Sequence, residues 1–406
     1  MFSQIADPVP AGPIPALIRL ASPGMRLADT DHQRDFRAGL RHWLAGQGPF
    51  GTDRDAAPEE LRAWSKRLHQ AGYAGLTWPA QHGGRGLSSA YQAIYAEEST
   101  AAGAPDHVNV IGLNMVGPSI IRHGSPEQQA TYLPQILSGD MVFCQGFSEP
   151  DAGSDLAAVR TRATPTEGGY RIEGEKLWSS YAHLADQCLL LARTAAAGTR
   201  HAGLTCLLVD MNTSGVQVRP LRQISGDSGF SQIVFTGAVT PDSTVLGEVG
   251  GGWEVAMTTL AHERGTFGVL LTARLAAQLA RLTRTAIDAG ADKDPLVRRE
   301  IAALHVEMQA LRYTGYRALA ATERTGKPGP ESSIIKLRWS QASQRTAALG
   351  LSLTARTGSD RRAMDTWTRY WTRQRLAART NTIEGGTSEI LRGVVADRVL
   401  GLPRSR

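Results

Sequence analysis

The sequence of 406 residues contains only three cysteines, few lysines and no long apolar run. Cys144, Cys188 and Cys206 are widely spaced and lie in apolar segments, so we expect buried, reduced thiols and neither a disulfide framework nor a metal site. No apolar run approaches the roughly 20 residues that a membrane helix needs, which argues against membrane insertion. Because no basic block alternates with aromatic residues, nucleic acid is not an expected partner.

The N-terminal residues lack the features of a secretory signal. Their first positive side chain is Arg19, prolines interrupt them, and no basic start precedes an apolar middle. We therefore expect a loose tail over residues 1–28 and a cytoplasmic protein. The whole sequence contains 42% hydrophobic and 20% charged residues. This composition and a length of 406 residues are sufficient for two or three domains with large hydrophobic cores.

The spacing of apolar residues divides the rest of the chain into three predicted domains. Residues 29–140 show a helical period. Residues 141–245 contain a series of short β-rich runs, which indicates a small antiparallel barrel or sandwich. Residues 246–406 return to the helical period and begin with one long amphipathic helix. The predicted order is therefore helical, then β, then helical.

Local signals mark the boundaries of several predicted elements. Ser125 is a candidate N-cap before a helix, and Gly168-Gly169 indicates a hairpin turn. The glycines at 250–252 separate the β-rich region from the long helix. Breaks between later helices are expected at Asp292-Lys-Asp-Pro295 and at Gly326-Lys-Pro-Gly-Pro330.

Two short segments carry most of the information about chemistry. The first, Phe147-Ser-Glu-Pro-Asp-Ala-Gly-Ser-Asp155, is a glycine-broken polar turn at the end of an apolar run. The second, Gly174-Glu-Lys-Leu-Trp-Ser-Ser180, places a large aromatic ring beside two small hydroxyls. Such groups can hydrogen-bond the polar edge of a flat heterocycle while a ring packs beside it.

These segments resemble the signature of the acyl-CoA dehydrogenase family, and the resemblance extends over roughly Asp31–Arg404. It implies an α+β fold with an N-terminal helical domain, a middle antiparallel β-barrel or sandwich domain and a C-terminal four-helix bundle. It also implies FAD as cofactor, an acyl-CoA substrate and an electron-transferring flavoprotein or a similar electron acceptor. On the family pattern, the residues that match cofactor contacts are Gln145, Phe147, Ser148, Gly153, Ser154, Trp178, Ser179, Ser180, Gly386, Thr387 and Glu389.

Phe147 is a departure from the family, which more often has a small aliphatic residue at this position. The substitution removes no hydrogen bond, but it could narrow the pocket. Ser154 matches a residue at the junction of the flavin and thioester sites. The resemblance also assigns Leu260, Arg264 and Glu384 to the substrate site.

The expected proton-abstracting base is the second departure. Many family members carry it in a Tyr-Glu-Gly-Thr stretch, whereas this chain reads Ile383-Glu-Gly-Gly-Thr387. The alignment puts Gly385 at the position of the base and Glu384 one residue early, where its side chain would point differently. Gly385 keeps its backbone N–H, which in the family helps to hold the thioester carbonyl.

A second branch of the family carries the base on the long helix, in a Leu-x-x-Glu-Arg context. This chain has Leu260-Ala-His-Glu-Arg264. Glu263 lies three residues after Leu260 and four before Phe267, so it falls on the apolar stripe of the helix. An ionisable group at such a position is either paired or functional. We expect Glu263 to be the base and Arg264 to order it; a structural salt bridge to another helix is the alternative.

Two segments with which homomeric family members complete a neighbouring subunit's flavin site are missing. Residues 288–297 lack the Arg-x-x-Phe-Gly pattern, and Ala347-Ala-Leu-Gly-Leu351 keeps one glycine but lacks the glutamine of Gln-x-x-Gly-Gly. The chain resembles subunits of actinobacterial hetero-oligomeric acyl-CoA dehydrogenases. We therefore expect an oligomer, a dimer of dimers, in which a related chain could complete the FAD site; a homo-oligomer is the alternative.

The resemblance implies dehydrogenation of an acyl-CoA to its trans-2-enoyl thioester, in fatty-acid or steroid side-chain breakdown. Three other functions remain open from the sequence. They are a dehydrogenase of a carrier-protein-bound acyl group, a flavin monooxygenase of the same fold, and a non-catalytic partner subunit. Glu263 argues against the monooxygenase, which needs no proton-abstracting glutamate. A partner subunit would keep the donor segments and lose the catalytic ones, the reverse of this sequence.

Overall fold

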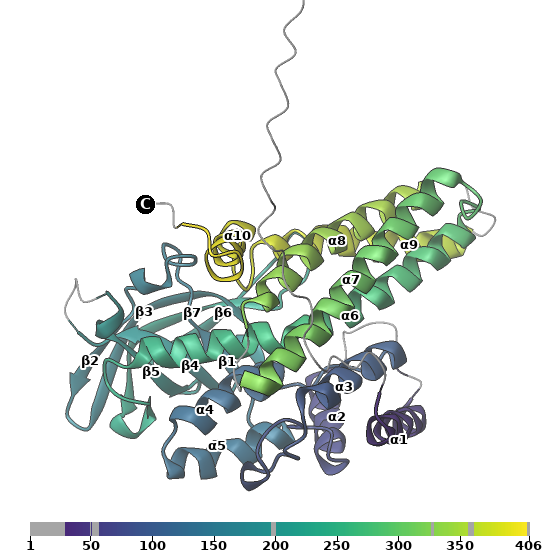
Figure 1. Cartoon of the computed structure of the whole chain (residues 1–406). Helices are drawn as coiled ribbons and strands as arrows, with labels where there is room; N and C mark the ends of the chain where they lie inside the picture. The colour runs from purple at the N-terminus through teal and green to yellow at the C-terminus, as the bar shows by residue number, and fades with distance from the viewer. Residues whose placement is uncertain are drawn as a thin grey trace, which may run out of the picture.

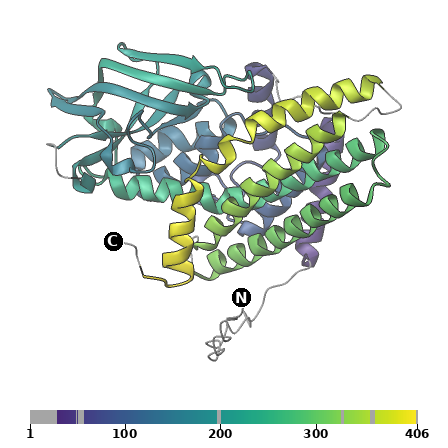
Figure 2. The ribbon, with the colours of Figure 1, turned by 90° about the horizontal axis from the view of Figure 1, so that it is seen from above.

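The computed structural model describes residues 29–48, 50, 57–195, 200–325, 329–355 and 361–403. Helices at the N-terminal side lie below the sheet and the long helices in the view of Figure 1, and the sheet and the long helices lie beside each other in both ribbon views (Figures 1 and 2). The expected α+β fold class with helical, β and helical regions is confirmed. The predicted tail, residues 1–28, lies outside the described residues.

The N-terminal region consists of short helices joined by loops. The predicted N-cap is confirmed, because Ser125 Oγ accepts from the N–H of Gln128 while the Gln128 side chain accepts from the N–H of Ser125. The helices are α1 (Asp31–Gln47), α2 (Pro58–Gln70), α3 (Ser89–Ala102), the π-helical segment η2 (Gly112–Val116), α4 (Gly117–His123) and α5 (Pro126–Ser138).

The middle region is one β-sheet, in which most neighbouring strands pair antiparallel. Within the described residues the strand order is β6-β7-β3-β2-β4-β5-β8, with β1 beside β4. The strands are β1 (Phe143–Gly146), β2 (Arg162–Thr166), β3 (Gly169–Ser180), β4 (Gln187–Arg193), β5 (Leu204–Asp210), β6 (Val216–Leu221), β7 (Phe230–Pro241) and β8 (Val245–Leu246). β1 and β2 pair with β4 in parallel, so the sheet is mixed rather than wholly antiparallel.

Strands β4 and β5 are buried on both faces, which explains their nearly continuous apolar sequences. On β4, Leu189 and Leu191 join a core cluster with α4 and α5, whereas Leu190 joins a second cluster on the opposite face. All three cysteines are buried and free, as expected. β2 and β3 form the predicted hairpin, with Glu167 and Gly168 at the turn because Thr166 pairs with Gly169.

The C-terminal region is a bundle of long helices, followed by a short one. The predicted breaks near residues 292–295 and 326–330 are confirmed, because α6 (Gly252–Asp288), α7 (Pro295–Thr325) and α8 (Glu331–Thr354) stop and start there. The bundle is completed by α9 (Arg361–Ala377), after which α10 (Ser388–Val394) and the π-helical segment η8 (Val395–Val399) lie against α8. No helix among the described residues is both long enough and apolar enough to cross a membrane.

Helix α6 connects all three regions. It begins at Gly252, where an added Cβ would lie 2.6 Å from the backbone of Thr205 in β5, so only glycine permits this close approach. Further along, Thr259 Oγ1 lies 2.8 Å from Ser119 Oγ of α4. Still further, Arg274 forms a 2.7 Å ion pair with Asp106 from the N-terminal region. The helix is thereby fixed against the sheet and against the N-terminal helices.

Gly350, the glycine that remains in the altered donor segment, has a packing role in the bundle. An added Cβ would lie 2.2 Å from Cδ2 of Trp371, whose side chain is fully buried and donates to Thr285 Oγ1. We expect Gly350→Ala to lower the free energy of unfolding by about 1–3 kcal/mol or more, because the rigid indole cannot move aside. Chemical denaturation measures the change.

Gly39→Ala is the matched control. Gly39 lies inside α1, and an added Cβ would meet nothing within 4 Å. This substitution should raise the free energy of unfolding by about 0.5–1 kcal/mol through helix propensity. If Gly350→Ala did not lower the free energy of unfolding relative to this control, the packing role of Gly350 would be wrong.

Candidate active site

The structure brings together the two segments that the sequence singled out. The first follows β1 as a loop, and the second forms the end of β3. The N–H of Leu177 donates to the carbonyl oxygen of Ser148 over 2.9 Å, so the loop lies alongside the strand. Ser148 is half-buried beside this contact, and Ser154 at the far end of the loop is exposed. Both hydroxyl positions therefore border one surface region.

Trp178 occupies an unusual backbone conformation at the end of β3. Its φ is 62°, in the left-handed region that bulky residues rarely adopt, and the pairing with β7 shifts register here. The side chain is 57% exposed and contacts Phe230 edge-on, with the ring centroids 6.1 Å apart. A large aromatic held outward by a strained backbone is typical of a ligand-binding position.

Of the other predicted cofactor contacts in these two segments, some lie at the surface and others are buried. Ser180 is half-buried, whereas the hydroxyl of Ser179 is buried and without a hydrogen-bond partner in the described structure. The ring of Phe147 is buried in the core, so it packs beneath the loop. Gln145 lies in β1 opposite Leu189, and Gly153 is exposed in the loop. Trp178, Ser180, Ser148 and Ser154 are therefore accessible side chains of the predicted set.

A buried ion pair, which the sequence analysis did not predict, holds the loop on the strand. The ammonium of Lys176 is fully buried, lies 2.8 Å from Glu149 Oε1 and donates to the carbonyl oxygen of Phe147 over 2.9 Å. The Glu149 carboxylate also accepts from the backbone N–H groups of Arg160 and Thr161, at 2.6 and 2.9 Å. The two residues thus fix both ends of the Ser148 turn.

The electrostatics of this pair reflect its burial. Burial lowers the pKa of Lys176, an effect that Glu149 opposes. Burial acts to raise the pKa of Glu149, but the attraction of Lys176 and the donated hydrogen bonds outweigh it, so that pKa lies below its usual value. The carboxylate is therefore ionised near neutral pH, and its several donors satisfy the charge that the protein interior would otherwise not tolerate.

The pattern of β3 contained a signal for this lysine. Tyr170 and Ile172 are buried, and Lys176 lies an even number of residues further on, so period-2 alternation points it to the same face. Its acidic partner follows Ser148 directly in the first motif. That the two residues meet depends on tertiary contacts, among them the hydrogen bond of Leu177 to the loop.

The third predicted part of the site is the loop between α9 and α10. Gly385 and Gly386 have φ values of 58° and 100°, and the ammonium of Lys336 in α8 donates to the carbonyl oxygen of Gly386 over 2.8 Å. Thr387 is the N-cap of α10, where its hydroxyl accepts from the N–H of Ile390. Glu389 is exposed in the first turn and pairs with Arg392. This loop is anchored on the bundle rather than on the sheet.

Glu384 lies in this loop in an unusual environment. Part of Glu384 is exposed to solvent, although the surrounding protein desolvates its carboxylate. Desolvation raises the pKa of Glu384, and the positive charges of Lys336 and Arg274 oppose the rise. The environment makes this carboxylate a stronger base than usual.

The position predicted for the base lies within α6. Helix α6 runs unbroken from Gly252 to Asp288 and so contains Glu263 and Arg264, whose side chains are outside the described part of the structure. Leu260, one turn earlier, packs against the core cluster shared by the sheet and the N-terminal helices. The assignment of Glu263 remains a prediction.

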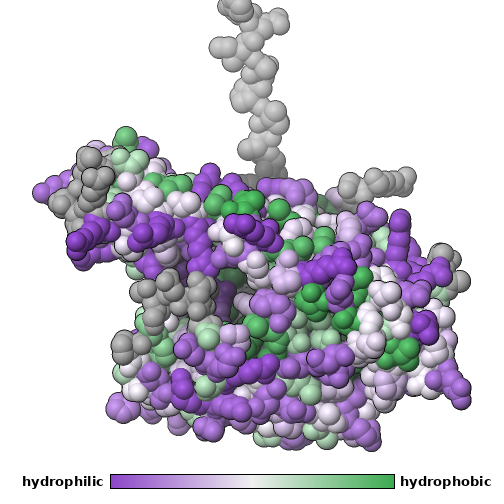
Figure 3. All heavy atoms as spheres, turned by 180° about the vertical axis from the view of Figure 1, so that it is seen from behind, coloured by the Kyte–Doolittle hydropathy of each residue, from purple (hydrophilic) through white to green (hydrophobic). Residues whose placement is uncertain are grey.

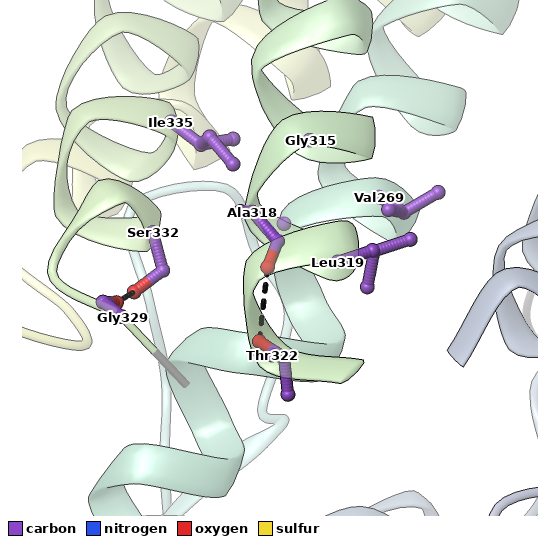
Figure 4. A pocket seen from close by; sticks show the side chains of 9 residues that line it. Val269, Gly315, Ala318, Leu319, Thr322, Gly329, Ser332 and Ile335 are labelled. Carbon is purple, nitrogen blue, oxygen red and sulfur yellow. Dashed lines mark hydrogen bonds between the residues drawn. The ribbon is translucent and has the colours of Figure 1, made fainter. Parts of the chain in front are cut away.

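A small cavity between α6, α7 and α8 lies just beyond this turn of α6 (Figure 4). Its volume is about 10 Å³, enough for a single water molecule at most. Thr322 and Ser332 use their hydroxyls on the carbonyl oxygens of Ala318 and Gly329, so the lining offers little polarity. This cavity is too small for an acyl group.

The role of the buried pair is testable by Lys176→Met. The variant leaves the Glu149 carboxylate buried without its cation, which should lower the free energy of unfolding by about 3–5 kcal/mol. The Ser148 turn should loosen, and the purified protein should retain less bound cofactor. Denaturation and the visible absorbance of the purified protein measure the two effects.

Lys66→Met is the matched control. Lys66 pairs with Asp140 at 2.8 Å on the surface, with 54% of its side chain exposed. Its loss should change stability by less than about 1 kcal/mol and leave cofactor content unchanged. A Lys176→Met variant that behaved like the control would show that the buried pair does not hold the loop.

The chain is similar along most of its length to known protein families and proteins. Family models described as the N-terminal, middle and C-terminal domains of acyl-CoA dehydrogenase match residues 30–140, 144–238 and 250–400. The sequence is 39% identical to acyl-CoA dehydrogenase IpdE1 of Mycolicibacterium smegmatis, over 91% of this chain and 98% of that protein. It is 40% identical to acyl-CoA dehydrogenase IpdE1 of Mycobacterium tuberculosis, with the same coverage of 91% and 98%.

Solved structures with the same fold include two-component assemblies. The Tcur3481-Tcur3483 steroid ACAD matches with a TM-score of 0.83 and 29% identity, over 94% of this chain and 100% of that one. The ChsE4-ChsE5 complex from Mycobacterium tuberculosis matches with a TM-score of 0.79 and 26% identity, over 94% and 100%.

The family uses FAD, and the described residues fit a flavin. Ser148 and Trp178 lie on adjacent segments, with the indole exposed at the surface instead of packed in the sheet. Beside the indole, Ser180 remains accessible as a donor to a ring edge. With three family models matched in order along the sequence, the chain belongs to the acyl-CoA dehydrogenase family and is an FAD-dependent acyl-CoA dehydrogenase.

Proposed function

We propose that this chain converts an acyl-CoA to its trans-2-enoyl thioester, with Glu263 as the proton-abstracting base. FAD supplies the hydride acceptor, which no side chain can provide. The chain must supply a carboxylate near the thioester's α-carbon and shield it from bulk water. Electrons then leave to an electron-transferring flavoprotein or a similar acceptor.

The observation that carries this proposal is the backbone at Gly385. The family often has its base at this position, but here φ is 58°, a conformation that a glutamate would adopt only with strain. The loop therefore favours glycine at this position, and in this proposal Gly385 contributes its backbone N–H as a donor to the thioester oxygen. One such donor is worth about 3 kcal/mol of transition-state stabilisation. The carboxylate must therefore come from another residue.

Two glutamates compete for the role. Glu384 has a raised pKa, which suits a base, but it precedes Gly385 and is attached to the loop at a different point. Glu263 belongs to α6. This helix is fixed before Glu263 by the contact of Thr259 with Ser119, and after it by the ion pair of Arg274 with Asp106. A base must be held within hydrogen-bond reach of the proton that it removes. The fixed helix meets this requirement better than the glycine-containing loop.

The base is tested by Glu263→Gln, with Glu384→Gln as the matched control. Mixed anaerobically with an acyl-CoA that reduces the wild type, Glu263→Gln should keep its bound FAD but reduce it at least about 100-fold more slowly. Glu384→Gln should keep most of the rate. Stopped-flow absorbance of the flavin gives both rates. The opposite result, with Glu384→Gln inactive and Glu263→Gln active, would move the base to Glu384.

We further propose that a related chain completes the FAD site in a hetero-oligomer. In the altered donor segment, residues 347–351, two residues pack in the core of this chain. Ala347 is fully buried, and Gly350 packs on Trp371. Ala347 and Gly350 are therefore not available to contact a neighbour's flavin. Helix α7 exposes Val306 and Tyr313, as surfaces that bind another chain often do. Seen from behind, the molecule also has apolar patches among hydrophilic residues (Figure 3).

Co-expression tests the assembly. The chain should be purified alone and together with a second family member that retains the Arg-x-x-Phe-Gly and Gln-x-x-Gly-Gly segments. We expect the pair to copurify and to contain more FAD per chain than this protein alone. Analytical ultracentrifugation and flavin absorbance measure assembly and occupancy. Equal occupancy with and without the partner would contradict the proposal.

A further inference from the structure

A larger pocket lies between the N-terminal helices and α6. Its volume is about 410 Å³, within the range of about 300–1,000 Å³ typical of small-molecule sites. Most of the pocket is lined by the loop after α2 and by residues of α3, η2 and α4. Helix α6 contributes His262. His262 directly precedes the proposed base, so the pocket adjoins the turn of α6 that carries Glu263.

The floor of the pocket is apolar and rigid. Trp78 is almost fully buried, and its indole N–H donates to the carbonyl oxygen of Leu113 over 3.1 Å. An added Cβ at Gly117 would lie 2.2 Å from the indole, so the ring is held tightly from the other side. Leu113, Pro118 and Ile121 extend this apolar surface, which suits a hydrocarbon chain or ring.

The edge of the pocket is polar and carries an unbalanced positive charge. The guanidinium of Arg122 forms no ion pair or side-chain hydrogen bond with any residue that the structure describes. Among the described residues, no carboxylate lines the pocket. Gln92 and Asn114 add amide groups. Burial lowers the pKa of His262, and the positive charge of Arg122 lowers it further. The imidazole is therefore neutral near pH 7 and can donate one hydrogen bond.

The wall that carries Arg122 is fixed on α6. Ser119 Oγ and Thr259 Oγ1 are 2.8 Å apart, and His123 Nε2 and Thr258 Oγ1 are 2.9 Å apart, on both sides of Arg122 in sequence. These contacts lie one turn before His262. Arg122, at the exposed edge, is thus held at a defined position relative to the turn that carries the proposed base.

We propose that this pocket receives the distal part of the acyl group and that Arg122 selects acyl thioesters carrying a carboxylate at that end. The apolar floor binds the hydrocarbon portion, while Arg122 pairs with the carboxylate and Gln92, Asn114 and His262 provide hydrogen bonds around it. This inference rests on the proposed function, because it needs the reacting carbon to lie near Glu263.

The test compares suberyl-CoA with octanoyl-CoA, which have equal length and differ by a terminal carboxylate. In wild-type holoenzyme we expect the higher kcat/KM for suberyl-CoA. Arg122→Gln should lower kcat/KM for suberyl-CoA by about 10- to 100-fold, as for loss of a charge-assisted hydrogen bond, and leave octanoyl-CoA within about threefold. Arg122→Lys should recover part of the loss. Arg299→Gln, an exposed arginine on α7, is the matched control and should change neither value.

Equal losses for both substrates in Arg122→Gln, or a wild type without preference for suberyl-CoA, would overturn the inference. Calorimetric binding of both thioesters to Glu263→Gln, with and without Arg122→Gln, separates it from the proposed function. If no thioester reduces the flavin but suberyl-CoA binds Glu263→Gln more tightly through Arg122, the reaction is wrong and the site is right. If reduction occurs and this binding difference is absent, the site is wrong.

Discussion

The contact between the Lys176 ammonium and the Glu149 carboxylate, 2.8 Å apart and buried, is the constraint on which the cofactor surface depends. Two charges removed from water are costly unless every donor and acceptor is satisfied. Here two backbone N–H groups, one carbonyl oxygen and the opposite charge meet that demand. Because the satisfied arrangement requires the loop in one position, the pair fixes Ser148 against β3 and so presents it beside Trp178.

Helix α6 gives the rest of the site its geometry. Its first residue lies against the backbone of β5, its hydroxyl contacts fix it to α4, and its later part belongs to the bundle. A residue on the N-terminal half of this helix is therefore placed relative to all three regions at once. A base at Glu263 would use that rigidity, and the pocket edged by Arg122 shares it. Chemistry and selectivity would then depend on the same few contacts between α4 and α6.

Much of the local structure was predictable because it depends on nearby residues. The N-cap at Ser125, the helix breaks before Pro295 and Glu331, and the buried run of β4 each follow from short-range geometry or from apolar pattern. The two cofactor motifs were recognisable for the same reason, since each is a continuous segment. The sheet was harder. β1 and β2 pair with β4 in parallel, and parallel pairs join strands that are distant in the sequence.

The sequence by itself determined the family, the order of the three regions, the glycine at the usual position of the base and the loss of the donor segments. Each of these is a property of residue identity along the chain. Only the tertiary structure decided that Lys176 meets Glu149, that Gly350 is fixed by Trp371, and that Arg122 and His262 edge one pocket. These pairings join residues from separate elements, and they arise from packing and from the need to satisfy buried charge, which no local pattern encodes.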